Sequence, residues 1–290
     1  MRQLIVQGIQ PSLAAFKPKF LNDLIRLGRE FDGGYLVNER AICASRYLLA
    51  FGINDDWSFE EDFLKRSPDT QIYCYDFSVS KAVFYAKVLN ALSGVFGIEC
   101  AVFVLTFRWK KIRKRLAALK YWIFTYFRFK TFLKKSNIHF YAKGISNEKN
   151  GDFVTLSDIF QMLPRQGMEG NSVFIKMDIE QSEYRVLPEM LNFKEYINGI
   201  VVEFHDLDIL WSSFVELVNS LRPYYEITHV HGNNHGSLIP GSNVPKALEI
   251  TFIKKNLISE HLPDRENISY PIHGLDQPNM PLAKDHPLIF

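Results

Sequence analysis

The sequence is poor in cysteine and contains no motif built from it. Its three cysteines, Cys43, Cys74 and Cys100, are scattered along 290 residues. This number and spacing exclude a disulfide framework and a cysteine-built zinc site, so reduced thiols are expected. The dinucleotide-binding fingerprint G-x-G-x-x-G is absent as well. The amino-terminal stretch holds only a short apolar run, Leu4 to Val6, which is too short for a signal peptide and predicts a cytoplasmic protein.

Acidic residues are missing from one long window of the chain. Residues 108–135 carry eleven Lys and Arg, eight aromatic residues and no Asp or Glu. Because the net charge of the whole chain is +2, this window at +11 leaves −9 for the remainder. It follows an apolar run, residues 88–107, whose only charge is Glu99. A membrane span needs about 20 apolar residues, but Glu99, Asn90 and two glycines argue against a span here.

Three hypotheses account for this basic and aromatic segment. The favoured one is that residues 88–135 form amphipathic helices on an anionic membrane surface, because basic and aromatic side chains bind that interface. The cytoplasmic protein would then attach peripherally to the inner face of a membrane. A helical lid or an oligomer contact with a solvated basic face is the second hypothesis, and nucleic-acid binding is the least favoured.

Apolar strand-like runs alternate with amphipathic segments along the rest of the chain, which predicts an α/β fold with a mostly parallel seven-stranded sheet. The second and third strands are separated by 60 residues, 78–137, where a crossover usually needs about 12 to 30. We therefore expect a leader over residues 1–46 and a main domain over residues 47–290 with a helical insertion at 79–136. The expected strands are Tyr47–Gly52, Gln71–Asp76, Ile138–Lys143, Val173–Asp178, Ile200–Phe204, Tyr225–His231 and Ala247–Ile253.

Glycine and acidic residues mark the carboxyl ends of three predicted strands, where ligands bind in open α/β sheets. Gly52 ends the first strand, and Asp55 lies in the polar turn that leads to a helix N-terminus, a place suited to the charged end of a cofactor. Asp76 closes the second strand, where an acid accepts the ribose hydroxyls of a nucleoside cofactor. Capping of the next helix is the alternative role for Asp76. Asp178 closes the fourth strand.

Histidines gather after the later strands. His205 lies in VVEFHDLD together with Glu203, and His231 lies in THVHGNNHG. Since strand ends share one rim of the sheet, we expect His205 and His231 to approach Asp178. Such a group could deprotonate a hydroxyl as a general base, or bind a divalent metal that lowers the pKa of the hydroxyl. The alternative to a catalytic or metal-binding role is that these are ordinary loop histidines in a hydrogen-bonded polar network.

The stretch FIKMDIEQSEYRVL, Phe174 to Leu187, resembles the signature of the FkbM-type methyltransferases, K-x-D-x-E-G-x-E-x-x-V-L. The departure is Gln181-Ser182, where that family has glycine and a small residue. The segment VTLSDI is also similar to the V-T-L-D-x-L of the family. The residues that match the signature are Lys176, Asp178, Glu180, Glu183, Val186 and Leu187.

The resemblance implies a class I methyltransferase sheet of the Rossmann-like type, in which the last two strands are antiparallel. It also implies O-methylation by S-adenosylmethionine of sugars or other glycan and polyketide hydroxyls. The basic and aromatic insertion extends the expected acceptors to lipid-linked glycans. The leader, with its motif D-G-G-Y-x-V, would cover the cofactor. The implied cofactor contacts are Gly52, Asp55, Asp76, Gly144 and Asp178; the expected catalytic residues, and equally the candidate metal ligands, are Asp178, His205 and His231.

Two other functions stay open at the level of sequence. One is a different Rossmann-like enzyme, such as a nucleotide-sugar-modifying enzyme. The other is a non-catalytic glycan- or membrane-binding relative, which the reduced glycine motif around Gly52 makes conceivable. The acceptor and the oligomeric state are not encoded in any motif that we identify.

Overall fold

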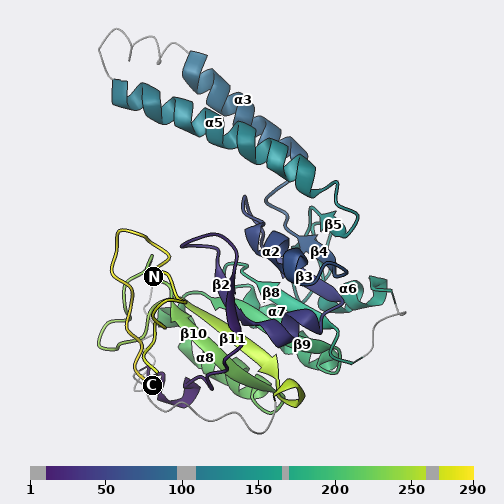
Figure 1. Ribbon diagram of the computed structural model, residues 1–290, viewed down its shortest axis with the longest axis vertical. Coiled ribbons are helices and arrows are strands. Elements are labelled where there is room, and N and C mark those ends of the chain that lie inside the picture. Colours follow the sequence, from purple (N-terminus) through teal and green to yellow (C-terminus); the bar gives the residue numbers. More distant parts are fainter. Residues whose placement is uncertain (1–10, 97–108, 165–169, 259–267) are drawn as a thin grey trace.

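A single seven-stranded sheet organises the computed structural model, which describes residues 11–96, 109–164, 170–258 and 268–290 (Figure 1). The strand order is β10-β11-β9-β8-β3-β4-β5. All seven predicted strands are present. Their bounds are β3 Tyr47–Phe51, β4 Gln71–Tyr75, β5 Ile138–Tyr141, β8 Val173–Met177, β9 Ile197–Phe204, β10 Tyr225–Gly232 and β11 Leu248–Lys254.

The sheet is parallel except at one strand. β11 pairs antiparallel with both β9 and β10, whereas β3, β4, β5, β8 and β9 pair in parallel. This confirms the predicted α/β class and the antiparallel pairing of the last two strands. The chain order reverses at β3, which has β4 on one side and β8 on the other, and ligands bind at the carboxyl ends of strands at such a switch point.

Side chains alternate between the two faces of the sheet, so each face has its own core. On β8, Ile175 and Met177 face one core, and Phe174 faces the other. Helix α6 begins with a capping box between Thr155 and Asp158, which satisfies the free N–H groups of its first turn. The first core is covered by η1 Ala14–Phe16, α6 Leu156–Met162, α7 Glu183–Met190 with η2 Leu191–Phe193, and α8 Leu207–Leu221.

The second core lies under the amino-terminal leader. It is covered by β1 Leu24–Leu27, β2 Tyr35–Asn38, α1 Glu39–Cys43 and α2 Ser58–Arg66. β1 and β2 form an antiparallel hairpin, and the D-G-G-Y motif lies at the end of its loop. A short parallel pair, β6 Gly144–Ile145 and β7 Phe153–Val154, follows β5, and η3 Lys255–Leu257 follows β11.

Helices form the insertion between β4 and β5, as predicted, and its described residues include α3 Lys81–Phe96 and α5 Trp109–Phe132. Figure 1 shows them side by side, extending away from the sheet. Their base belongs to the second core, because Phe84, Phe129 and Phe132 pack around Trp57. Part of the apolar run, residues 97–108, lies outside the described residues. Among the helices that the structure describes, none is long and apolar enough to cross a membrane.

Candidate functional site

A cavity of about 340 Å³ opens at the carboxyl ends of β3, β4 and β8. We call it the strand-end cavity. Four of the five predicted cofactor residues line it: Gly52, Asp76, Gly144 and Asp178. Its lining consists of Gly52, Asn54, Tyr75, Asp76, Phe77, Ser78, Gly144, Ile145, Phe153, Asp178, Ile179, Glu180, Ser182 and Arg185.

Gly52 shapes the floor of this cavity. Its φ is +75°, and a Cβ atom at this position would lie 1.8 Å from the carbonyl oxygen of Asp178. Its own carbonyl oxygen accepts a hydrogen bond of 2.7 Å from Nζ of the buried Lys176. Only glycine combines this φ with such a close approach of two chains. Glycine is therefore needed at position 52 both for the turn and for the close packing against Asp178.

Asp76 ties together the two loops that border the cavity. One carboxylate oxygen accepts a hydrogen bond of 2.8 Å from the backbone N–H of Asn54. The other accepts bonds of 2.7 Å and 2.6 Å from the backbone N–H and the hydroxyl of Ser78. The alternative role, capping of the next helix, is wrong: α3 begins at Lys81, and the hydroxyl of Ser80 accepts the hydrogen bond from the backbone N–H of Val83 in its first turn. A carboxylate offers about four acceptor positions, so Asp76 retains acceptor capacity beyond these three bonds.

Two aromatic residues at the cavity were not predicted from the sequence. Phe77 is 63 % exposed and its ring centroid lies 5.4 Å from that of Phe153. Both side chains line the cavity. The sequence did contain a signal for Phe77, because this aromatic residue directly follows the strand-end acid Asp76. A flat apolar ring beside an acid of the kind that binds ribose suits a nucleobase.

Asp55 does not line the cavity. Its carboxylate accepts a hydrogen bond of 2.7 Å from the hydroxyl of Tyr121 on α5. The predicted cofactor contact of Asp55 is therefore wrong, because this side chain binds the insertion helix instead.

Asp178 and His205 meet beside the cavity, as expected. Oδ1 of Asp178 lies 3.6 Å from Nε2 of His205, and its Oδ2 accepts a hydrogen bond of 3.2 Å from the hydroxyl of Tyr35. Nε2 of His205 also lies 3.8 Å from Glu203 and 3.7 Å from Glu180. Glu203 shares a strand face with His205 by the period of two, a signal that points to it from sequence alone.

Four carboxylates lie near the ring nitrogens of His205. Its Nδ1 lies 2.5 Å from Oε1 of Glu183, a fully buried acid on α7. Burial lowers the pKa of His205, but the hydrogen bond to Glu183 and the charges of Glu203 and Asp178 outweigh it and raise the pKa to about 10. Burial and the neighbouring Asp178 raise the pKa of Glu203 well above its ordinary value.

His231 lies apart from this cluster, contrary to the expected approach to Asp178. Its Nδ1 lies 3.3 Å from Glu249 and its Nε2 lies 3.0 Å from Asp285. The reason is the strand order: β11 lies between β10 and β9, so Glu249 of β11 stands between His231 and Glu203 in the register. Both ring nitrogens of His231 therefore hold the carboxyl-terminal segment and the neighbouring strand.

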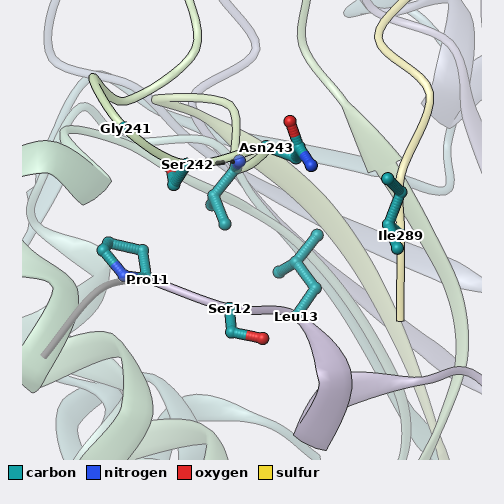
Figure 2. A pocket seen from close by; sticks show the side chains of 8 residues that line it. Pro11, Ser12, Leu13, Gly241, Ser242, Asn243 and Ile289 are labelled. Atoms are coloured by element: carbon teal, nitrogen blue, oxygen red, sulfur yellow. Dashed lines mark hydrogen bonds between the residues drawn. The ribbon is translucent and has the colours of Figure 1, made fainter.

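A second pocket, of about 400 Å³, shares no lining residue with the strand-end cavity (Figure 2). Figure 2 shows Pro11, Ser12 and Leu13 on one side of it and Ile289 near the end of the chain on another. Its remaining lining comes from the loop between β10 and β11, residues 241–244. None of the described residues that line it has an ionisable side chain.

No protein-family model matches this chain, and no curated protein matches it in sequence. Solved structures with a similar arrangement include a precorrin-6y C5,15-methyltransferase from Geobacter metallireducens, at 11% identity and a TM-score of 0.33, with 74% of this chain and 86% of that chain covered. The plantazolicin methyltransferase BpumL, solved in complex with SAH, has 9% identity and a TM-score of 0.33, with 74% and 82% covered.

A third similar structure is the small RNA methyltransferase HEN1. It has 11% identity and a TM-score of 0.34, and the match covers 75% of this chain and 24% of that chain. These values are too low to assign a family or an activity to this chain. The strand order and the strand-end residues therefore carry the functional argument.

Proposed function

We propose that this protein is an S-adenosylmethionine-dependent O-methyltransferase that acts on a sugar or glycan hydroxyl. The strand-end cavity is the observation that carries the proposal. It lies at the switch point of the sheet and combines the glycine turn at Gly52 with the acid Asp76. Its volume of about 340 Å³ falls within the usual range of small-molecule sites. The resemblance of residues 174–187 to the FkbM-type signature supports the same cofactor.

Each end of the cofactor has a partner in this proposal. Asp76 accepts hydrogen bonds from the ribose hydroxyls, using the acceptor capacity that its loop contacts leave. The adenine ring packs against Phe77 and Phe153, since both rings border the cavity. The sulfonium end lies toward Gly52 and Asp178, whose backbones are in contact.

The acceptor hydroxyl binds beside Asp178 and His205 in this proposal. Asp178 lines the cavity, and its carboxylate contacts Tyr35 and His205. A general base or a bound divalent metal there would make the hydroxyl a better nucleophile. Sugar and glycan acceptors are proposed from the family resemblance, and a polar cluster of this kind suits a substrate rich in hydroxyls.

Titration calorimetry with S-adenosylhomocysteine tests the cofactor assignment. We expect micromolar binding, which corresponds to about −8 kcal/mol. Asp76→Ala should weaken binding by about 1–3 kcal/mol, because charge-assisted hydrogen bonds are lost. The matched control is Asp69→Ala, since Asp69 is an exposed carboxylate on the turn before the same strand. It should bind like the wild type.

The alternatives give different outcomes in the same measurement. A folded wild-type protein that binds no S-adenosylhomocysteine would contradict the methyltransferase proposal. Binding of NAD or a nucleotide sugar in its place would favour another Rossmann-like enzyme. Binding of glycan or vesicles without any nucleoside ligand would favour the non-catalytic relative.

We also propose that the insertion attaches this enzyme to an anionic membrane, a second candidate function with its own observation. Helix α5 carries eight Lys and Arg and no acid. An apolar stripe runs along it, formed by Leu116, Leu119, Ile123, Phe124 and Phe127. Phe124 and Phe127 are 63 % and 59 % exposed. Large exposed aromatics flanked by basic residues suit the interface of an anionic bilayer.

A further inference from the structure

We propose that Asp178, Glu203 and His205 bind one divalent cation beside the strand-end cavity. Each residue offers one ligand atom, and these atoms lie within 4.8 Å of one another. The inference rests on the proposed methyltransferase function for its role, because the cation would bind the acceptor hydroxyl. It also replaces His231, which the sequence had suggested as a ligand, with Glu203.

The orientation of His205 is the first argument. Its Nδ1 pairs with Glu183 at 2.5 Å, and Glu183 is fully buried. Metal-binding histidines usually donate their second ring N–H to a carboxylate in this way, which fixes the ring and the tautomer. Nε2 is then free to point at other groups, and it faces three carboxylates: Asp178 at 3.6 Å, Glu180 at 3.7 Å and Glu203 at 3.8 Å.

These separations are the second argument. They are too long for hydrogen bonds between Nε2 and the carboxylate oxygens. Two ligand atoms that each lie about 2.1 Å from one ion are about 3.0–3.6 Å apart at angles of 90–120°. The distances from Nε2 to Asp178 and Glu203 are therefore within a few tenths of an ångström of this range, and all three ligand atoms lie within 4.8 Å of one another.

Charge is the third argument. Glu203 is only 5 % exposed, and the amide of Asn233 donates its hydrogen bond of 2.7 Å. One neutral donor does not compensate a buried carboxylate that lies near Asp178 and Glu249. On the other side of the histidine, Oε2 of Glu183 is buried without a hydrogen-bond partner among the described residues. A cation between Asp178, Glu203 and His205 supplies the missing positive charge.

The donor set indicates the kind of cation. Two carboxylates suit Mg²⁺ and Mn²⁺, and one imidazole favours Mn²⁺ or Zn²⁺ over Mg²⁺. Three protein ligands leave coordination positions open for an acceptor oxygen. Because Asp178 also lines the strand-end cavity, that oxygen would lie next to the cofactor.

Methyl transfer to the acceptor is then a simple substitution at the methyl carbon. The acceptor O–H bond breaks, and its proton passes to the exposed carboxylate of Glu180 and on to solvent. The electron pair on oxygen forms the new bond to the methyl carbon. The bond from that carbon to sulfur breaks, and its electron pair stays on sulfur. The products are a methyl ether, S-adenosylhomocysteine and one proton.

Calorimetry and electron paramagnetic resonance with Mn²⁺ test the site on the full-length protein after chelation. We expect one bound Mn²⁺ per chain. Glu203→Gln and His205→Ala should each weaken Mn²⁺ binding at least 10-fold, while the affinity for S-adenosylhomocysteine changes less than 2-fold. Glu203→Gln keeps the side-chain shape, so it tests the site even if His205→Ala fails to fold. His235→Ala, at an exposed histidine, is the control and should bind Mn²⁺ normally.

Two results would overturn the cation site. One is a folded wild-type protein that binds neither Mn²⁺, Mg²⁺ nor Zn²⁺; a proton on Nε2 of His205 would then be the charge that the carboxylates hold. The other is Mn²⁺ binding that both variants leave unchanged. The same measurements distinguish failure of the cation site from failure of the methyltransferase proposal. A wild-type protein that binds Mn²⁺ but not S-adenosylhomocysteine would contradict only the methyltransferase proposal.

Discussion

Asp178 takes part in two neighbouring environments through different atoms. Its carbonyl oxygen lies against Gly52, which closes the floor of the strand-end cavity. Its carboxylate accepts a hydrogen bond from Tyr35 and faces His205. Asp178 therefore contacts both the proposed cofactor site and the proposed acceptor site. A substitution at Gly52 that moves the backbone of Asp178 should affect both sites.

Gly52→Ala should disturb both the fold and the cavity. The αL conformation costs a non-glycine residue about 1–3 kcal/mol, and the added Cβ would also displace the backbone of Asp178. We expect a lower free energy of unfolding in urea and weaker binding of S-adenosylhomocysteine by calorimetry.

The control for that change is Gly94→Ala on α3. A Cβ atom there meets nothing within 4 Å. Replacing a helical glycine with alanine stabilises a protein by about 0.5–1 kcal/mol. Equal behaviour of the two variants would refute the packing role of Gly52.

At the scale of elements, the insertion divides into a buried base and an exposed remainder. Phe84, Phe129 and Phe132 fix the base against Trp57 in the second core. Farther from the sheet, the apolar stripe of α5 is exposed to solvent. The base makes the hairpin part of the fold, and the remainder is available to a partner.

Reversing three exposed charges of α5 should abolish attachment to anionic vesicles. Each basic group near an anionic surface contributes about 1 kcal/mol, so Lys110→Glu, Arg113→Glu and Lys114→Glu together should lower partitioning roughly 10²-fold or more. Sedimentation with phosphatidylserine-containing and pure phosphatidylcholine vesicles at low and high salt measures this. Phe124→Ser should instead reduce the part of binding that salt does not screen.

A triple reversal on the main domain is the matched control, at the exposed residues Lys17, Arg222 and Lys255. It should leave vesicle binding intact if the insertion is the contact. Equal binding to both vesicle types, or none, would favour a lid or an oligomer contact. S-adenosylhomocysteine affinity should stay unchanged in the α5 variant, because the sheet forms the strand-end cavity.

At the scale of the whole molecule, two buried histidines of β10 hold the carboxyl-terminal segment, residues 268–290, against this strand. His229 lies 3.1 Å from Asp276, and His231 lies 3.0 Å from Asp285. Burial lowers the pKa of His231, but hydrogen bonds to Asp285 and Glu249 outweigh it and raise the pKa to about 10. The charge on this histidine therefore contributes to the stability of the folded chain.

That contribution has a defined pH dependence. A histidine whose folded pKa is raised stabilises the fold fully below its unfolded pKa, near 6.5, and loses this contribution as pH rises to about 10. Urea denaturation at pH 7 and pH 9.5 should show lower stability at the higher pH. Breaking a buried ion pair costs about 3–5 kcal/mol, so His231→Gln should be less stable at pH 7 and less sensitive to pH.

His235→Gln, at the exposed histidine in the loop that follows β10, should keep the wild-type pH dependence. If His231→Gln also kept it, the pairs with Glu249 and Asp285 would not hold the segment in solution.

The sequence by itself determined the strands and their class. Runs such as Tyr47–Phe51 are buried on both faces, so they are continuous apolar segments in the sequence. The rule that ligands meet strand ends then singled out Gly52, Asp76 and Asp178, and the three line one cavity. These are local properties of chain segments, which is why they could be predicted.

Only the tertiary structure decided which polar side chains meet. Asp55 contacts Tyr121, 66 residues away in the chain, and His231 contacts Asp285, 54 residues away. Strand order placed β11 between β9 and β10, and so kept His231 away from His205. Side-chain partners across strands depend on register and on the packing of distant segments, and neither is a property of any local stretch of sequence.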